Sequence, residues 1–260
     1  MDKAKALLER FRKGPLAIGG HVFLTDPSLS EAMACHGYDF IWIDAEHGPF
    51  DKERILSHIV AANAGGAAAI VRVVTNDAAV IKPILEMGPD GIIIPMVCSA
   101  QQAKDAIAAC LYPPKGIRGF GPRRACRYGA IPTETYLAQA DSSCLRIVQI
   151  EHKDAVADID AILAVEGLDA VIIGPNDLSA SIGLLGKPTH PEVLKLCATT
   201  IARCKAAGKP CGVSIGPGDP QAISMWLATG VDFISCGDDI SFLAMGARST
   251  LDYIKKAWIQ

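Results

Sequence analysis

Two carboxylates stand where strand-like apolar runs of this sequence end. Glu151 closes the run that begins at Leu145, and Asp177 follows the run Ala170–Ile173. Because the carboxyl ends of all strands in a parallel sheet lie on one side, both acids would reach the same face. Either acid alone would more often be a cap or an ion-pair partner. As a pair of hard oxygen ligands, they favour a site for a divalent cation such as Mg²⁺ or Mn²⁺.

Two further runs would bring a base and a cation to that face. His47 follows Phe40–Asp44, and an imidazole titrates near physiological pH, so it can take a proton from carbon or oxygen. Asp44 is close enough in the sequence to orient the ring. Arg72 ends the next run, where a guanidinium is costly unless it meets an anion or a carbonyl. An ion pair with a neighbouring strand's carboxylate is the alternative for Arg72. Together these residues predict metal-assisted carbonyl chemistry.

The turn Gly174–Ser179 leads into a predicted short helix. Backbone N–H groups at such a turn bind carboxylate or phosphate oxygens. Because Pro175 has no N–H, the candidate donors are Asn176 and Asp177. Of the other histidines we expect a structural role, with His21 the least secure because it follows the first apolar run. The remaining four are His36, His58, His152 and His190.

Eight short apolar runs recur along the chain, separated mostly by helical patterns. They are Leu16–Gly20, Phe40–Asp44, Ala68–Val73, Gly91–Met96, Leu145–Glu151, Ala170–Ile173, Cys211–Ile215 and Asp232–Cys236. Continuous rather than alternating hydrophobicity is typical of strands buried on both faces of a parallel sheet. Strand followed by helix, eight times, predicts a (β/α)8 barrel that occupies residues 1–260 as a single domain. An open doubly wound sheet is the alternative.

One connection, Leu111–Cys144, is longer than the fold requires, and such connections are often functional. It carries four arginines, which would either bind an anionic substrate tail or belong to a subunit contact or a solvated basic loop. They are Arg118, Arg123, Arg124 and Arg127.

The composition excludes several classes of protein. Half of the 260 residues are hydrophobic, and the net charge of −3 argues against a general attraction to nucleic acid. The nine cysteines are odd in number and form no Cys-x-x-Cys motif, which favours a reducing cytosol. The segment Met1–Arg12 is typical of a surface helix rather than a signal peptide, and no apolar stretch is long enough to span a bilayer.

Several ordered motifs resemble the HpcH/HpaI family of pyruvate-dependent class II aldolases, which act on 4-hydroxy-2-oxo-heptanedioate or on 2-keto-3-deoxy sugar acids. The resemblance runs from about Leu16 to Leu251. Its most specific segments are Val148–Glu151 and Ile173–Ser179. The others are Ile43–Pro49, Val71–Asp77, Pro95–Val97 and Tyr112–Gly119.

The resemblance implies a (β/α)8 (TIM) barrel of the phosphoenolpyruvate/pyruvate-type superfamily, assembled as a hexamer whose last helix is exchanged between neighbouring barrels. It also implies that Glu151 and Asp177 hold the metal, and that Arg72 contacts the keto or enolate oxygen of pyruvate. His47 would transfer protons, with Asp44 orienting it or a water. Substrate would be bound by Gln149, by the turn residues Gly174, Asn176 and Asp177, and by Ser214.

Two positions depart from the family pattern. Glu86 stands where the family usually has an Asp that reaches a neighbouring subunit's site, and Ser214 stands where Leu is frequent, near the expected aldehyde path. A Schiff-base mechanism would need a lysine on a barrel strand. None of the eight runs contains one, which favours the metal route.

The expected reaction is reversible cleavage of a 4-hydroxy-2-oxo acid to pyruvate and an aldehyde through a metal-stabilised enolate, with Mg²⁺, Mn²⁺ or Co²⁺. Such a cytoplasmic lyase would serve aromatic or sugar-acid catabolism. Two alternatives are a lyase or synthase acting on oxaloacetate or an acyl-CoA substrate, and a non-catalytic keto-acid-binding barrel.

Overall fold

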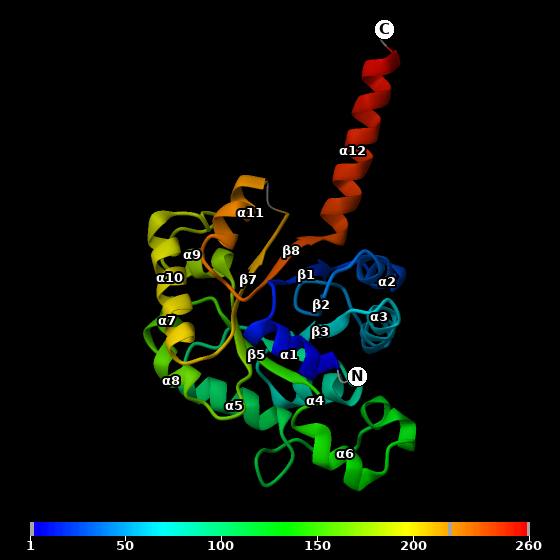
Figure 1. Cartoon of the computed structure of the whole chain (residues 1–260), viewed down its shortest axis with the longest axis vertical. Coiled ribbons are helices and arrows are strands. Elements are labelled where there is room, and N and C mark those ends of the chain that lie inside the picture. The colour runs from blue at the N-terminus through cyan, green and yellow to red at the C-terminus, as the bar shows by residue number, and fades with distance from the viewer. Residues whose placement is uncertain (1–2, 218–219, 259–260) are drawn as a thin grey trace.

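Eight parallel strands pair in chain order and close on themselves, because β1 pairs with both β2 and β8 (Figure 1). The computed structural model describes residues 3–217 and 220–258. The strands are β1 Ala17–Val22, β2 Phe40–Asp44, β3 Ala68–Arg72, β4 Gly91–Ile94, β5 Leu145–Ile150, β6 Ala170–Ile173, β7 Cys211–Ile215 and β8 Phe233–Asp238. The predicted (β/α)8 barrel is therefore confirmed, and the open sheet is excluded.

Helices lie between successive strands, as the helical patterns between the apolar runs predicted. They are α1 Lys3–Lys13, α2 Ser28–Cys35, α3 Lys52–Ala64, α4 Ala78–Glu86, α5 Ala100–Cys110, α6 Thr133–Ala140, α7 Lys153–Ala157, α8 Ile159–Leu163, α9 Pro175–Ser181, α10 Pro191–Ala206, α11 Pro220–Leu227 and α12 Asp239–Trp258, with a 3-10 segment η1 Arg124–Gly129. Asp51 caps α3 by accepting from the Arg54 N–H at 2.8 Å, and Ser99 caps α5 through Gln102. The long connection holds η1 and α6, which the sequence analysis did not predict.

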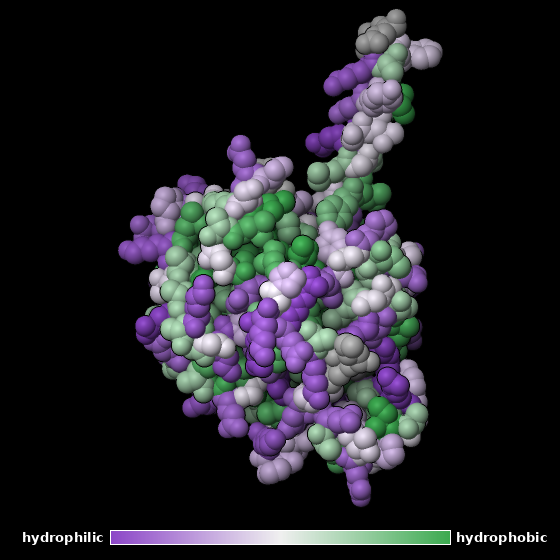
Figure 2. All heavy atoms as spheres, in the orientation of Figure 1, coloured by the Kyte–Doolittle hydropathy of each residue, from purple (hydrophilic) through white to green (hydrophobic). Residues whose placement is uncertain are grey.

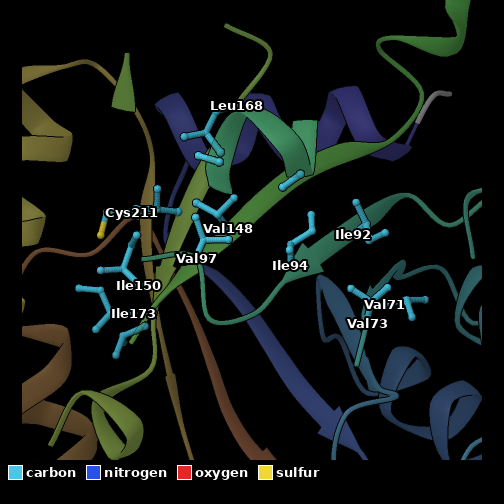
Figure 3. Close-up of a cluster of buried hydrophobic side chains, with 14 of the residues drawn as sticks. Val71, Val73, Ile92, Ile94, Val97, Val148, Ile150, Leu168, Ile173 and Cys211 are labelled. Atoms are coloured by element: carbon cyan, nitrogen blue, oxygen red, sulfur yellow. The ribbon is translucent and has the colours of Figure 1, made fainter. Parts of the chain in front are cut away.

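Two separate hydrophobic cores explain why the strands are apolar on both faces. Inside the barrel, Trp42, Ile70, Ile93, Ile147 and Ile172 are fully buried. The alternate side chains of the same strands point outward and pack under the helices; Figure 3 shows part of this outer core, including Ile92, Ile94, Val148, Ile150 and Ile173. Since successive strand residues face opposite sides, both layers must be hydrophobic.

The amino-terminal end of the barrel is closed by α1. Its Ala4, Leu7 and Phe11 are buried, and the Phe11 ring stacks on Phe233 with a centroid distance of 3.9 Å. Gly212 makes room for the Phe233 ring, because a Cβ at position 212 would come within 2.3 Å of that ring. The expected surface helix is thus a plug for the barrel, although its first two residues lie outside the described part.

The last helix, α12, projects away from the barrel (Figure 1). Figure 2 shows hydrophobic residues along one edge and at the base of α12, and hydrophilic residues along the opposite edge. An apolar groove runs along it, lined by Phe242, Leu243, Gly246, Ala247, Thr250, Leu251 and Ile254. Among the residues that the structure describes, no helix is both long and apolar enough to cross a bilayer.

Candidate active site

A cavity of about 190 Å³ lies where the strands end at their carboxyl termini. The barrel brings to it every residue that the sequence analysis placed in the site except Glu151. These lining residues are Asp44, His47, Arg72, Gln149, Gly174, Asn176, Asp177 and Ser214. They come from strands β2, β3, β5, β6 and β7 and the turns that follow them, which is where enzymes of this architecture place their chemistry.

The Arg72 guanidinium is buried and held in a fixed position. It forms an ion pair with Asp44, and its Nη1 lies 2.9 Å from Glu46 Oε2. Nη1 also lies 3.4 Å from Gln149 Oε1, and the guanidinium carbon is 5.2 Å from the centre of the Trp42 ring. The ion pair that we considered for Arg72 is therefore present, and the guanidinium still lines the cavity.

Asp44 shapes the turn that carries His47 but does not hold its ring. Asp44 Oδ1 accepts from the backbone N–H groups of Glu46 and His47, both at 3.1 Å. The His47 side chain is 61% exposed, and its Nε2 lies 3.9 Å from Glu46 Oε2. The carboxylate beside the imidazole is thus Glu46, which directly precedes His47 and to which the sequence pattern assigned no role. Burial raises the pKa of Glu46, and the nearby Arg72 opposes the rise.

Glu151 lies just behind the cavity wall rather than on it. Its side chain accepts from the Met96 N–H at 2.7 Å and from the Gln149 amide. Met96 adopts a left-handed backbone conformation with φ of 53°, which aims its N–H at the carboxylate. A Cβ at Gly174 would come within 2.8 Å of Glu151 Oε2, so a larger residue there would displace the Glu151 carboxylate. These packing partners could not be predicted from the sequence, because Met96 and Gly174 lie far from Glu151 along the chain.

The donor chemistry around Glu151 and Asp177 fits a divalent cation. Burial raises the pKa of Glu151 to about 7, and the charge of Asp177 adds to the rise. The neighbouring cation, Arg72, is already committed to Asp44 and Glu46. Within the described residues, no three His, Cys, Asp or Glu side chains gather into a metal site on their own. Oxygen atoms of substrate and water would have to complete the coordination, as is usual for Mg²⁺ and Mn²⁺.

The turn after β6 forms the predicted short helix, α9. Asn176 and Asp177 occupy its first turn, where backbone N–H groups have no acceptor within the helix. Ser179 Oγ donates to the Asn176 carbonyl at 2.6 Å and so tightens this turn. The expected donors to a substrate carboxylate therefore lie at the cavity, beside Gly174.

His21, for which we expected a structural role, lies at the cavity. It lines the cavity, its Nδ1 lies 3.0 Å from the Gly237 carbonyl oxygen, and its Nε2 lies 3.0 Å from Ser214 Oγ. Burial lowers the pKa of His21, so the ring is neutral at physiological pH. The other histidines are structural: His58 is hydrogen-bonded to Ser30, and three lie at helix ends, namely His36, His152 and His190.

The arginines of the long connection lie at the opposite end of the barrel. With Lys3 and Asp90, three of them line a separate cavity of about 640 Å³; these are Arg118, Arg124 and Arg127. Arg118 Nη2 lies 3.0 Å from Glu86 Oε1, and Arg124 donates to the carbonyls of Met87 and Gly88. Within one chain, these contacts are structural, so a role in binding the substrate tail at the cavity is not supported. Glu86 is likewise engaged by Arg118.

Comparison with known proteins shows what this chain is similar to. It is 40% identical over 241 residues to a 4-hydroxy-2-oxovalerate aldolase of Novosphingobium aromaticivorans, covering 92% of this chain and 90% of that protein. It is 36% identical over 256 residues to a 5-keto-4-deoxy-D-glucarate aldolase of Citrobacter koseri, covering 98% and 97%.

Solved structures show the same similarity. An HpcH/HpaI aldolase/citrate lyase family protein from Burkholderia cenocepacia superposes with a TM-score of 0.90 at 31% identity, over 96% of this chain and 99% of that one. The citrate synthase SbnG superposes with a TM-score of 0.86 at 29% identity, over 98% and 99%. The model of one family matches residues 18–244. The chain therefore belongs to the HpcH/HpaI aldolase/citrate lyase family, and it is a carbon–carbon lyase.

Proposed function

We propose that this enzyme reversibly cleaves a 4-hydroxy-2-oxo acid into pyruvate and an aldehyde. The observation that carries the proposal is the gathering of Arg72, Gln149 and Asp177 around one cavity, with Glu151 directly behind it. Relatives named as aldolases for 4-hydroxy-2-oxovalerate and 5-keto-4-deoxy-D-glucarate support the same class of reaction. One chain supplies all of these residues, and we propose that residues 1–260 form a single barrel domain.

In the cleavage direction, the bond between C3 and C4 breaks and its electrons form the pyruvate enolate. A base takes the proton of the 4-hydroxyl as that carbon becomes the aldehyde, and protonation at C3 then gives the methyl group. His47, exposed at the cavity and beside Glu46, is the proposed proton-transfer group. Arg72 donates to the keto or enolate oxygen from its fixed position. Gln149 and the first turn of α9, at Gly174, Asn176 and Asp177, bind the keto acid.

Glu151 and Asp177 are the proposed ligands of a divalent cation, Mg²⁺, Mn²⁺ or Co²⁺. When bound, the cation supplies Lewis-acid stabilisation of negative charge on oxygen. The raised pKa of Glu151 supports this assignment, because burial and the negative charge of Asp177 both favour a cation beside the two carboxyl groups. Asp44 acts through Arg72 and the turn at His47, rather than by holding the imidazole.

The test is metal-dependent exchange of pyruvate methyl protons in deuterated water, followed by product analysis with a panel of aldehydes. We expect Asp177→Asn to abolish both activities while the protein stays folded. The matched control is Asp160→Asn, because Asp160 forms an exposed surface ion pair with Arg203. Full activity of Asp177→Asn after chelation and return of metal would remove Asp177 from the site. Tight pyruvate binding without exchange would instead favour the keto-acid-binding alternative.

A synthase acting on oxaloacetate or an acyl-CoA is the second candidate, supported by the likeness to the citrate synthase SbnG. The same enolate-forming residues would serve it, because fold and enolate site do not fix the electrophile. Product formation that requires an acyl thioester would favour this candidate over the aldolase.

We further propose a homo-oligomer, a hexamer in which α12 packs on a neighbouring barrel, in a reducing cytoplasm. The exposed apolar groove of α12 supports an assembly of this kind. Cys110, Cys197 and Cys204 are buried, unpaired thiols, as expected for a protein of a reducing compartment.

A further inference from the structure

The cavity has two chemically different sides. The keto-acid side described above comes from β3, β5 and β6. The opposite side comes from β7, β8 and β1, which adjoin in the closed barrel, and it carries Ser214, Asp238 and His21. We call these three side chains the polar wall. Nothing in the proposed cleavage of the keto acid uses them, so they are free to act on the second substrate.

The hydrogen bonds of His21 fix which way the Ser214 hydroxyl points. A carbonyl oxygen only accepts, so His21 Nδ1 must carry the proton that it shares with Gly237, at 3.0 Å. The neutral ring then presents a lone pair at Nε2, and Ser214 Oγ donates to it at 3.0 Å. The Ser214 oxygen consequently offers the cavity its lone pairs.

Asp238 adds a second acceptor and a negative charge to the wall. It is 9% exposed, and its two carboxylate oxygens accept from the N–H and the hydroxyl of Ser241, at 2.8 and 2.9 Å. A carboxylate has about four acceptor sites, so further sites stay available. Among the described residues that line the cavity, the permanent cation is Arg72, and it is paired with Asp44 and Glu46. The polar wall therefore has no cation to receive an anionic group.

We propose that the polar wall binds the aldehyde through a hydroxyl group next to its carbonyl, and that it selects short neutral hydroxyaldehydes over plain alkyl aldehydes and over anionic semialdehydes. This inference rests on the proposed aldolase function. A substrate hydroxyl donates to Ser214 or Asp238, whereas an alkyl group leaves both acceptors without a partner. A substrate carboxylate would face Asp238 without a counter-charge. The cavity, at about 190 Å³, is below the roughly 300–1,000 Å³ of typical ligand sites, which favours a short aldehyde.

The test compares kcat/KM for two matched pairs of aldehydes, with pyruvate and Mg²⁺ or Mn²⁺. Lactaldehyde and propionaldehyde differ by one hydroxyl, and glyceraldehyde and tartronate semialdehyde differ by a hydroxymethyl group in place of a carboxylate. We expect lactaldehyde to be preferred about tenfold over propionaldehyde, and glyceraldehyde at least about tenfold over tartronate semialdehyde. Equal rates in the first pair, or a preference for tartronate semialdehyde in the second, would overturn the proposal.

Two variants separate the contributions of the polar wall. Ser214→Ala should bring the lactaldehyde preference close to parity, and Asp238→Asn should raise the relative rate with tartronate semialdehyde about tenfold. Asn at position 238 can still accept from the Ser241 N–H, so the start of α12 is preserved. Ser57→Ala, on the exposed face of α3, is the control and should leave both ratios as they are.

Proton exchange of pyruvate is measured in the same samples. If the unaltered protein gives neither exchange nor aldol product, the proposed function fails. If exchange and aldol addition occur but Ser214→Ala keeps the full lactaldehyde preference, the proposed function stands and the polar wall is refuted.

Discussion

Replacing Glu151 by glutamine should abolish turnover and, without metal, make the protein more stable at alkaline pH. Burial raises the pKa of this carboxyl from its ordinary 4.5 to about 7. Between about pH 4.5 and about pH 7, the Glu151 carboxyl is therefore protonated in the folded state but ionised in the unfolded state. Stability falls as the pH rises through this window, because the folded state binds more protons there.

The size of the effect follows from the two pKa values. A rise of about 2.5 units corresponds to about 3.4 kcal/mol between fully protonated and fully ionised carboxyl. Between about pH 5 and about pH 8, most of this difference is lost, which amounts to roughly 2.5 kcal/mol. Glutamine does not ionise, so Glu151→Gln lacks this loss. In this variant the Gln149 amide loses the carboxylate oxygen to which it donates and faces another amide. We expect this change to lower the stability of the variant by about 1 kcal/mol at every pH.

Urea unfolding in the presence of a chelator, at several pH values, measures the difference. The free energy of unfolding of the unaltered protein should fall by roughly 2.5 kcal/mol relative to Glu151→Gln as the pH rises from about 5 to about 8. Adding Mg²⁺ or Mn²⁺ at alkaline pH should stabilise the unaltered protein and leave the variant unchanged. Parallel pH curves for the two proteins would refute the reasoning, as would equal stabilisation by metal.

Two further predictions concern other parts of the chain. Arg72→Lys should lower kcat by about 100-fold, because lysine lacks the several N–H donors of the planar guanidinium. Arg72→Ala should lower kcat as well, and it should also lower the free energy of unfolding by about 3–5 kcal/mol, because the buried Asp44 carboxylate loses its ion-pair partner. Equal melting temperatures of the two variants would contradict this. The double variant Leu243→Arg/Leu251→Arg, in the groove of α12, should sediment as a smaller species than the unaltered protein. The control Ser249→Arg, outside that groove, should sediment like the unaltered protein. If all three proteins have the same mass, the proposed contact is ruled out.

The strands could be predicted from the sequence because burial on both sides leaves a continuous apolar run. The run from Phe40 to Asp44, for example, has the bounds of β2. The helix α6, from Thr133 to Ala140, was missed because only Tyr136 and Ala140 are buried in it, too few to give a clear period. The helical pattern between the fifth and sixth apolar runs is divided into α7 and α8 at Asp158, whose backbone is not helical.

Cavity-lining residues could be predicted from the sequence where they lie at or just after the end of one strand, as Arg72 and Asp177 do. The role of His21 could not, because its partners Ser214 and Gly237 are 193 and 216 residues away in the chain. Glu151 follows β5, as expected, but its depth behind the wall depends on the backbone of Met96 and on the missing side chain at Gly174. Such non-local contacts leave no periodic signal.

The plug formed by α1 has a kinetic consequence. Phe11 stacks on Phe233 and seals the amino-terminal end of the barrel. The described cavity lies at the carboxyl ends of the strands, on the other side of the packed interior. A ligand that reaches this cavity from the carboxyl-terminal side should therefore also leave on that side.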